Sequence, residues 1–182
     1  MKRLQRAAVL LSLIEALRRR DSWCAETNVQ KAVYFLQELL EVPLDLEFVL
    51  YKYGPYSFDL REELTSLRAD SILTFEIRDP TYGPSYAPGQ LRDLIVGDFP
   101  KTISRFRKEI DFVAERLGNK GIAELERLST ALYVRLRSPD TGVHKRAQSV
   151  RELKPHISSP LAEQAVKEVD AMFEEWQAIC KE

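Results

Sequence analysis

The residues of this chain that are best suited to recognition chemistry surround a Gly-Pro bend. The stretch from Leu50 to Ser57 contains three tyrosines and one lysine. Gly54 can adopt backbone angles that cost other residues energy, and Pro55 disfavours helical angles at the residue before it. We therefore expect a strand to end at this corner and Ser57 to cap a new helix. Such a corner would gather phenol hydroxyls, an ammonium group and helix amides, which suit binding but define no reaction.

The sequence contains no pattern typical of an active site: no nucleophile with a base, no phosphate loop and no metal-ligand spacing. His144 and His156 lie in a basic segment, where a histidine could cleave phosphodiesters by acid–base chemistry. No second acid or base accompanies them at a suitable spacing, so we interpret both as surface histidines. Cys24 and Cys180 stand alone, which excludes a cysteine zinc site or redox pair. We therefore predict no catalytic residues, no metal and no cofactor, and we lean against an enzyme.

The balance of charge gives no general attraction to nucleic acid. Among 182 residues, 27 Lys and Arg face 28 Asp and Glu, for a formal net charge of -1. Binding to DNA would therefore need a local basic patch, and residues 1–20 and 135–154 provide two. The apolar runs are too short to cross a bilayer, and the N-terminus lacks the features of a secretion signal. With two isolated cysteines, these features predict a cytoplasmic protein that does not associate with membranes.

Apolar spacing predicts the elements that position the corner. We expect an amphipathic helix from Leu4 to Leu17 and a second helix that starts at a capping box, Thr27 and Gln30, and continues to Pro43. An alternating strand over residues 44–50 would lead into the corner. After the helix that begins at Ser57, a hairpin is predicted from an alternating strand over residues 72–77 and turn residues over 79–84.

The second half of the sequence indicates helices only. They are predicted from Pro100 to Leu117, over residues 122–136, over 144–153 and from Ser159 to Ile179. The resulting fold class is α+β and mainly helical. We expect a winged-helix-like unit with a small antiparallel sheet over residues 1–97. A helical half over residues 98–182 would pack on it in one compact domain. The last helix has a broad apolar face, which would pack on the chain's own core or, alternatively, form a homodimer interface.

Several segments together resemble a known family. A helix with the sequence Lys-Ala-Val-Tyr-Phe-Leu at residues 31–36 precedes the strand and the Tyr-Gly-Pro-Tyr-Ser corner at residues 53–57. Residues 123–133 and 150–155 continue the likeness into the second half. The chain resembles the YwgA-like proteins over most of its length, with the corner as the most specific part. More distantly, its first half resembles the Panacea antitoxin domain.

The resemblance to Panacea domains implies a partner that is a toxin or a regulatory protein, whereas the YwgA-like resemblance implies no assigned activity. From the residues themselves, aromatic anchors beside a cation are typical of the centres of protein interfaces. We therefore predict a non-catalytic regulatory or antitoxin-like module that recognises a protein partner. The predicted partner-binding residues are Tyr51, Lys52, Tyr53, Gly54, Pro55, Tyr56, Ser57 and Arg61.

A winged-helix-like DNA-binding regulator is the alternative function. In that case the phosphate contacts would come from the cations on and near the helix after the corner and from the basic segment before residue 154. These candidates are Lys52, Arg61, Arg68, Lys145 and Arg146. The segment of about sixteen residues between Leu40 and Ser57 is longer than the turn of a compact helix-turn-helix, which argues against this alternative.

Overall fold

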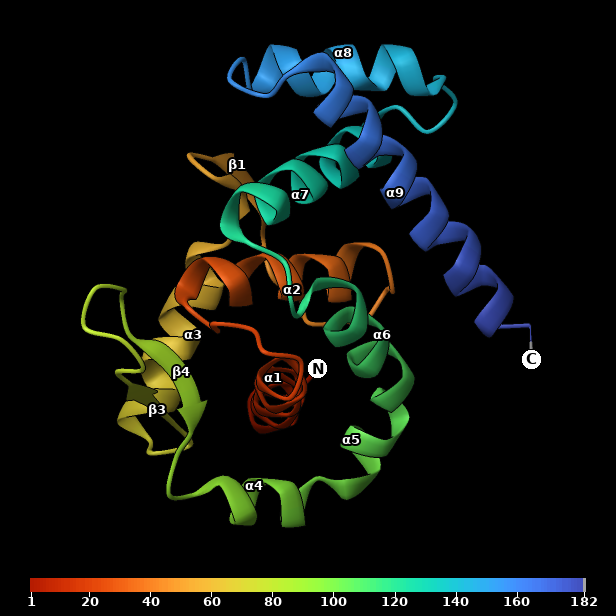
Figure 1. The fold of residues 1–182 in the computed structure, drawn as a ribbon. Helices are drawn as coiled ribbons and strands as arrows, with labels where there is room; N and C mark the ends of the chain where they lie inside the picture. Colours follow the sequence, from red (N-terminus) through yellow and green to blue (C-terminus); the bar gives the residue numbers. More distant parts are fainter. Residues whose placement is uncertain (182) are drawn as a thin grey trace. The chain divides into compact units, whose positions relative to one another are not determined.

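The computed structural model describes residues 1–181 and confirms an α+β, mainly helical fold (Figure 1). In chain order the elements are α1 (Arg3–Arg18), α2 (Glu26–Glu38), β1 (Val49–Tyr51), β2 (Gly54–Tyr56), α3 (Phe58–Ala69), β3 (Leu73–Glu76), β4 (Ser85–Pro88), α4 (Arg92–Asp98), α5 (Pro100–Arg105), α6 (Arg107–Leu117), α7 (Ile122–Arg137), α8 (Val143–Leu153) and α9 (Ser159–Ile179). One sheet contains β1 and β2, and the other contains β3 and β4.

Contacts within the chain define two compact units. Unit 1 comprises Met1–Val49 and Tyr56–Lys120, and unit 2 comprises Leu50–Pro55 and Gly121–Glu182. The chain therefore enters unit 2 briefly in the hairpin between β1 and β2 before it returns with α7. The sequence placed a boundary between residues 97 and 98, whereas α5 and α6 belong to unit 1 because they pack on α1 and α2.

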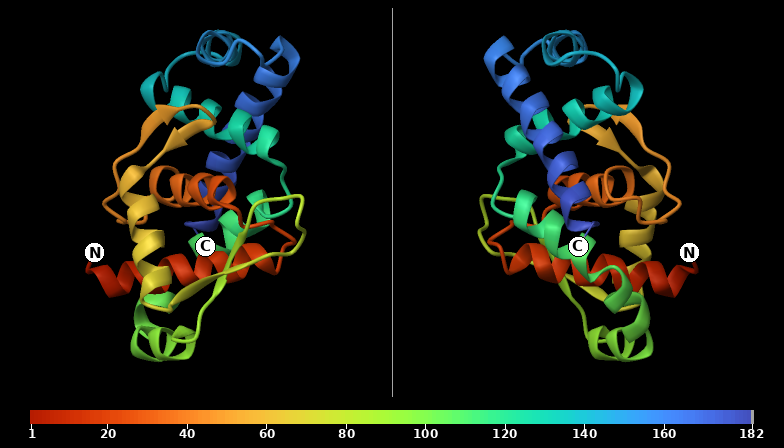
Figure 2. Two further views of the ribbon diagram at one scale, coloured as in Figure 1. Left: turned by 90° about the vertical axis from the view of Figure 1, so that its left-hand side faces the viewer. Right: turned by 90° about the vertical axis from the view of Figure 1, so that its right-hand side faces the viewer.

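Helix α1 is the centre of unit 1. Residues 7–14 are buried without interruption, so the helix is apolar on all sides rather than amphipathic as predicted. Figure 1 looks along its axis and shows the other elements of unit 1 around it, and Figure 2 shows it from the side. A helix that is hydrophobic all round has to be enclosed. The sequence stripe from Leu4 to Leu17 was only part of a larger apolar surface.

The predicted capping box at the start of α2 does not form. The N-cap residue is Ala25, and its side chain makes no cap hydrogen bond. Gln30 instead lies fully buried and contacts the chain just before α3. Its side-chain amide donates to the carbonyl of Ser57 at 2.8 Å and accepts from the Ser57 amide at 2.9 Å. A side chain near the start of α2 therefore satisfies both backbone groups of the residue that caps α3.

Residues 44–48 do not form the predicted strand, and only Val49–Tyr51 is paired as β1. Leu44 and Leu46 are buried as the alternation predicted, but the backbone between them does not join a sheet. Gln37 takes the place of a neighbouring strand: its side chain donates to the Leu46 carbonyl at 2.8 Å and accepts from the Leu46 amide at 2.9 Å. The apolar alternation predicted the burial of Leu44 and Leu46 correctly. However, a side chain from α2 takes the backbone hydrogen bonds that a neighbouring strand would make.

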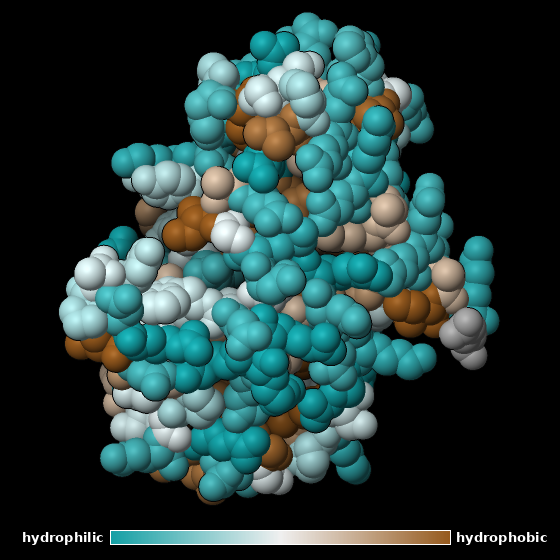
Figure 3. Space-filling model, viewed as in Figure 1, coloured by the Kyte–Doolittle hydropathy of each residue, from teal (hydrophilic) through white to brown (hydrophobic). Residues whose placement is uncertain are grey.

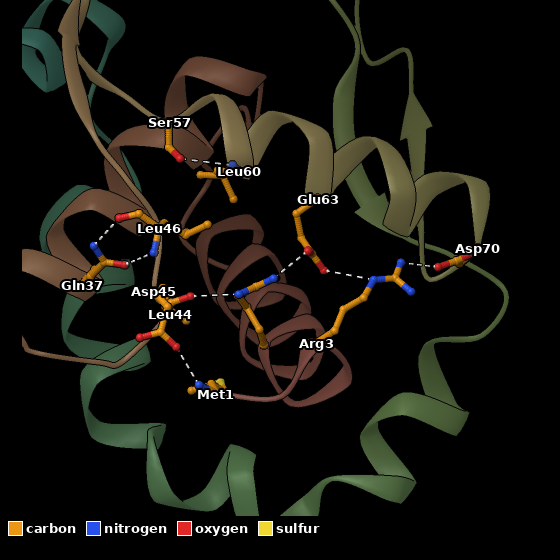
Figure 4. A network of polar contacts seen from close by, with 11 residues as sticks. Met1, Arg3, Gln37, Leu44, Asp45, Leu46, Ser57, Leu60, Glu63 and Asp70 are labelled. Carbon is orange, nitrogen blue, oxygen red and sulfur yellow. Dashed lines mark hydrogen bonds and ion pairs between the residues drawn. The ribbon is translucent and has the colours of Figure 1, made fainter.

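A polar network joins the N-terminal end of α1 to α3 (Figure 4). The buried carboxylate of Glu63 accepts a hydrogen bond from Arg6 Nη2 at 2.9 Å and lies 3.7 Å from Arg3 Nε. Arg3 also donates to Asp70 at 2.5 Å, and Arg6 donates to the carbonyl of Leu44 at 3.1 Å. Because these groups come from three segments of unit 1, they fix the position of α3 relative to α1.

The elements after the corner follow the sequence pattern closely. Ser57 Oγ accepts a hydrogen bond from the Leu60 amide at 3.2 Å, as expected of an N-cap. The predicted hairpin forms from β3 and β4, which pair antiparallel with Leu73 opposite Pro88 and Glu76 opposite Ser85.

The long helix predicted from Pro100 to Leu117 is interrupted at Phe106, which separates α5 from α6. Phe106 and Ile103 are both buried, so the interruption lets the chain turn while apolar residues on each side still reach the core of unit 1. Helix α4, which the sequence pattern did not predict, precedes α5. Together these helices extend around α1 (Figure 1).

Unit 2 consists of residues Leu50–Pro55 and helices α7 to α9. The three helices pack on one another through apolar side chains. The buried members include Leu125, Leu128, Leu132, Val150, Ala162, Val166, Val169 and Met172. The predicted apolar face of α9 is therefore buried from Ala165 to Met172, whereas Leu161 at its start is exposed. A homodimer interface on the remainder stays a prediction.

Candidate functional site

The Tyr-Gly-Pro corner is divided between the two units. Tyr51–Pro55 belong to unit 2, whereas Tyr56, Ser57 and Arg61 belong to unit 1. The strand does not end at the Gly-Pro bend as predicted, because the chain turns at Lys52 and Tyr53 and continues from Gly54 as β2. The candidate site is the hairpin tip, Tyr51–Gly54, together with the residues of unit 2 that contact it.

Gly54 contacts α7 directly. Its φ angle is +86°, in the region that favours glycine. A Cβ at this position would lie 2.8 Å from Ser129 Oγ and 3.3 Å from Thr130 Oγ1. Both hydroxyls are buried and donate hydrogen bonds to the carbonyl of Glu126, so neither is free to move aside without loss. Glycine is therefore required here both by the backbone angle and by the approach of the tip to α7.

Lys154, the C-cap residue of α8, binds the backbone of the hairpin tip. Its ammonium group donates hydrogen bonds to the carbonyl oxygens of Tyr51, at 3.0 Å, and of Lys52. The same nitrogen lies 3.1 Å from Glu126 Oε1. The side chains of Lys154 and Glu126 are each 8% exposed. One buried cation thus neutralises a buried carboxylate and fixes two successive carbonyls of the hairpin turn.

His156 completes this cluster at its solvent side. Its Nε2 lies 3.3 Å from Glu126 Oε2, and its side chain is 62% exposed. The arrangement places an imidazole, an ammonium group and a carboxylate together. The hydroxyls of Ser129 and Thr130 donate to the carbonyl of Glu126. The cluster is therefore arranged as a support for the tip, with each charge paired.

The tip presents aromatic rings to solvent. Tyr51 is 56% exposed and Tyr53 is 47% exposed. The Lys52 ammonium group lies 5.4 Å from the centre of the Tyr53 ring, within the range of a cation–π contact. Two rings and one cation therefore project from a backbone that Lys154 and Gly54 hold in place. On the face shown in Figure 3, hydrophobic residues form small separate patches among hydrophilic ones.

The unit 1 part of the corner is more closely engaged. The Tyr56 hydroxyl donates to Glu26 Oε1 at 2.5 Å, and its ring packs edge-on against Phe58, with ring centres 5.1 Å apart. Burial and the hydrogen bond to Glu26 raise the pKa of Tyr56 to about 12, and Arg61 opposes this shift. Ser57 is fully buried as a cap, while Arg61 is exposed on α3. Of the three tyrosines, Tyr56 is thus a structural residue with a committed hydroxyl.

The predicted nucleic-acid candidates are divided between the two units, and one of them is buried. Arg146 is buried, and its two terminal nitrogens each donate to a different oxygen of Asp170 at 2.7 Å. Arg135 binds the same carboxylate. Lys145 is exposed in unit 2, whereas Arg68 lies in unit 1 with its guanidinium 3.5 Å from the centre of the Phe75 ring. Arg146 therefore stabilises unit 2 and is not a surface cation.

Within residues 1–181, His, Cys, Asp and Glu side chains do not form a group of three that could hold a metal ion. Over the same residues, every helix is too short or too polar to span a membrane. His144 is highly exposed and pairs with Glu163 at 3.4 Å. Both histidines are thus exposed, as the sequence predicted.

Comparison of the sequence with protein-family models and with curated proteins finds no match.

Sequence reasoning missed the supports of the site. Glu126 and Lys154 are 28 residues apart and far from the corner in sequence, so local spacing gave no reason to connect them. One signal was present: Glu126, Ser129 and Thr130 interrupt the apolar pattern of α7 at buried positions.

Proposed function

We propose that this protein is a non-catalytic binding module, of the regulatory or antitoxin-like kind, and that it recognises a protein partner through the hairpin tip. The observation that carries the proposal is the combination of exposed Tyr51 and Tyr53 rings with a backbone fixed by Lys154. Aromatic side chains with few rotatable bonds make strong anchors in interfaces. A backbone that is already ordered avoids much of the entropy cost of binding.

The paired charges beneath the tip favour binding over catalysis. Glu126 is neutralised by Lys154 and contacts His156, and the nearby hydroxyls donate to a backbone carbonyl. A nucleophile activated by a neighbouring base would need a hydroxyl directed at the imidazole. The partner that the resemblance to Panacea domains implies is a toxin or a regulatory protein.

The proposal is tested by affinity capture from the native cytoplasm, followed by titration of the recovered partner. Y53A and K52E should each weaken binding by about tenfold or more, as expected for central anchors. Tyr82, which is 65% exposed in unit 1, provides the matched control, and Y82A should bind as wild type. Circular dichroism should show that all three variants are folded. Equal affinity of Y53A, K52E and wild type would contradict the proposal.

A DNA-binding regulator remains the alternative that the sequence raised, and it is less well supported because Arg146 is buried against Asp170. The alternative predicts duplex retardation that weakens steeply with salt and is reduced by R61A, R68A and K145A. The protein-binding proposal predicts no retardation at low salt.

A further inference from the structure

In unit 1, the edge of β4 that faces away from β3 already has hydrogen-bond partners. The amide of Tyr86 donates to the carbonyl of Cys24 at 2.9 Å, and the carbonyl of Tyr86 accepts from Arg18 Nη1 at 3.1 Å. Both backbone groups of Tyr86 therefore point away from β3. In an antiparallel pair this defines a position at which the two facing residues do not bond each other.

The register then fixes the direction of the backbone groups on β3. Phe75 faces Tyr86, and Leu73 faces Pro88, which has no amide hydrogen to donate. The pair beyond Leu73 and Pro88 agrees with this alternation, because the amide of Gly89 donates to the carbonyl of Ile72 at 2.8 Å. The amide and carbonyl of Phe75 must therefore point to the opposite edge of the sheet, as must those of Leu73.

That opposite edge is open. In the part of the chain that the structure describes, the amide and carbonyl of Phe75 have no hydrogen-bond partner. Phe75 is 37% exposed, so the edge can be reached from solvent. A groove follows the edge between β3 and α3. It is lined by Thr65, Arg68, Ala69, Leu73, Thr74 and Phe75. An open strand edge is a template for another strand.

The groove also carries an uncompensated charge. The Arg68 guanidinium stacks on the Phe75 ring at 3.5 Å from its centre. Over residues 1–181 it lies within ion-pair distance of no carboxylate, in contrast to Arg3, Arg6 and Arg18 of the same unit. Arg68 lines the groove, and a guanidinium that stacks on a ring can still donate hydrogen bonds from its edge. An acidic side chain would complement it.

We propose that an extended segment of a partner protein adds to the free edge of β3 as a third strand and places an acidic side chain against Arg68. Its backbone exchanges hydrogen bonds with Phe75, and its side chains enter the groove between β3 and α3. This second interaction surface lies in unit 1 and does not depend on the hairpin tip.

A designed probe tests this surface directly in the full-length protein. The probe is a fluorescein-labelled octapeptide that alternates threonine and valine around one central glutamate. Fluorescence anisotropy should saturate with wild type. A version with alternate backbone amides N-methylated, which blocks strand pairing, should bind about tenfold more weakly. R68E should weaken binding at least about fivefold, whereas R151E, an equal change of charge at an exposed site in unit 2, should not.

Amide hydrogen exchange followed by NMR locates the peptide. The amide of Phe75 should exchange quickly in the free protein and become protected when the peptide binds, while the Tyr86 amide should be protected in both states. Failure of the peptide to saturate at millimolar concentration would overturn the proposal. So would equal binding by the N-methylated peptide, or protection that appears elsewhere. Y53A should leave peptide binding unchanged, which separates this surface from the hairpin tip.

Discussion

Lys154 Nζ and the carbonyl oxygen of Tyr51 form a hydrogen bond of 3.0 Å, although the two residues are 103 positions apart. The bond ties the turn of the β1–β2 hairpin to the end of α8. The same ammonium group neutralises Glu126, so a single buried cation links hairpin, α7 and α8 within unit 2. The orientation of the exposed tyrosines therefore depends on a residue that the partner would not contact.

Replacing Lys154 should destabilise the protein strongly. K154M removes the buried cation and leaves the buried carboxylate of Glu126 with only the exposed His156 beside it; breaking such a pair costs about 3–5 kcal/mol. Urea denaturation would measure the loss. K145M removes an exposed lysine from α8 and should change the free energy of unfolding by less than about 0.5 kcal/mol. The double variant E126Q/K154M should be more stable than K154M alone. Equal stability of K154M and K145M would contradict the clamp.

Gly54 should tolerate no side chain. In G54A the positive φ angle costs about 1 kcal/mol, and the new methyl group would displace Ser129 Oγ at additional cost. Thermal denaturation should show a lowered Tm. S129A should restore part of the loss, because it removes the close contact but not the backbone strain. G83A provides the control, since a Cβ there meets nothing within 4 Å. Similar Tm values for the two glycine variants would show that the tip does not need this close approach.

Tyr56 should titrate well above the usual range for a phenol. Burial and the hydrogen bond to Glu26 raise the pKa of Tyr56 from 10.0 to about 12. The folded state therefore holds the proton more tightly than the unfolded state. The resulting stabilisation is complete below pH 10 and is lost as the pH rises through about 12. Ultraviolet difference titration of wild type against Y56F isolates this group. E26Q should lower the pKa of Tyr56, and a value near 10 in wild type would contradict the observed geometry.

Arg146 should matter for stability and not for nucleic acid. R146A leaves the part-buried Asp170 with fewer partners, although Arg135 still contacts it. We expect a loss of about 2–4 kcal/mol in the free energy of unfolding, somewhat below that of a fully isolated buried pair. K145A, one residue earlier and exposed, should lose less than about 0.5 kcal/mol. An R146A protein as stable as K145A would remove the structural role assigned to this arginine.

Most of the helices and the β3–β4 hairpin were predictable from sequence because their signals are local, whereas α4 and the break between α5 and α6 were not. Ser57 does cap α3, and apolar spacing located α1, α7 and the start of α2 to within a few residues. The errors arose where distant side chains replaced local partners. Gln30 binds the Ser57 backbone instead of forming the predicted capping box. Gln37 binds the backbone of Leu46, in the segment where a strand was expected.

The candidate site shows the same division. The gathering of tyrosines and a lysine at the corner was predicted from its composition, as was the special backbone of Gly54, whereas the exposure of the Tyr51 and Tyr53 rings became known only from the structure. The support beneath them was not predicted, because Glu126 and Lys154 acquire their meaning only when helices far apart in sequence pack together. Conversely, Arg146 was predicted to be a surface cation, because its partner Asp170 is distant in sequence and no local pattern indicated the pair.

Site-specific photocrosslinking in living cells examines recognition through the hairpin tip. A photoreactive phenylalanine analogue would replace Tyr53 in one protein and Tyr82, which is also exposed, in another. One discrete crosslinked protein is expected from position 53, lost when K52E is added, and none of the same mass from position 82. Crosslinks that are absent from position 53, or identical from both positions, would contradict recognition through the hairpin tip.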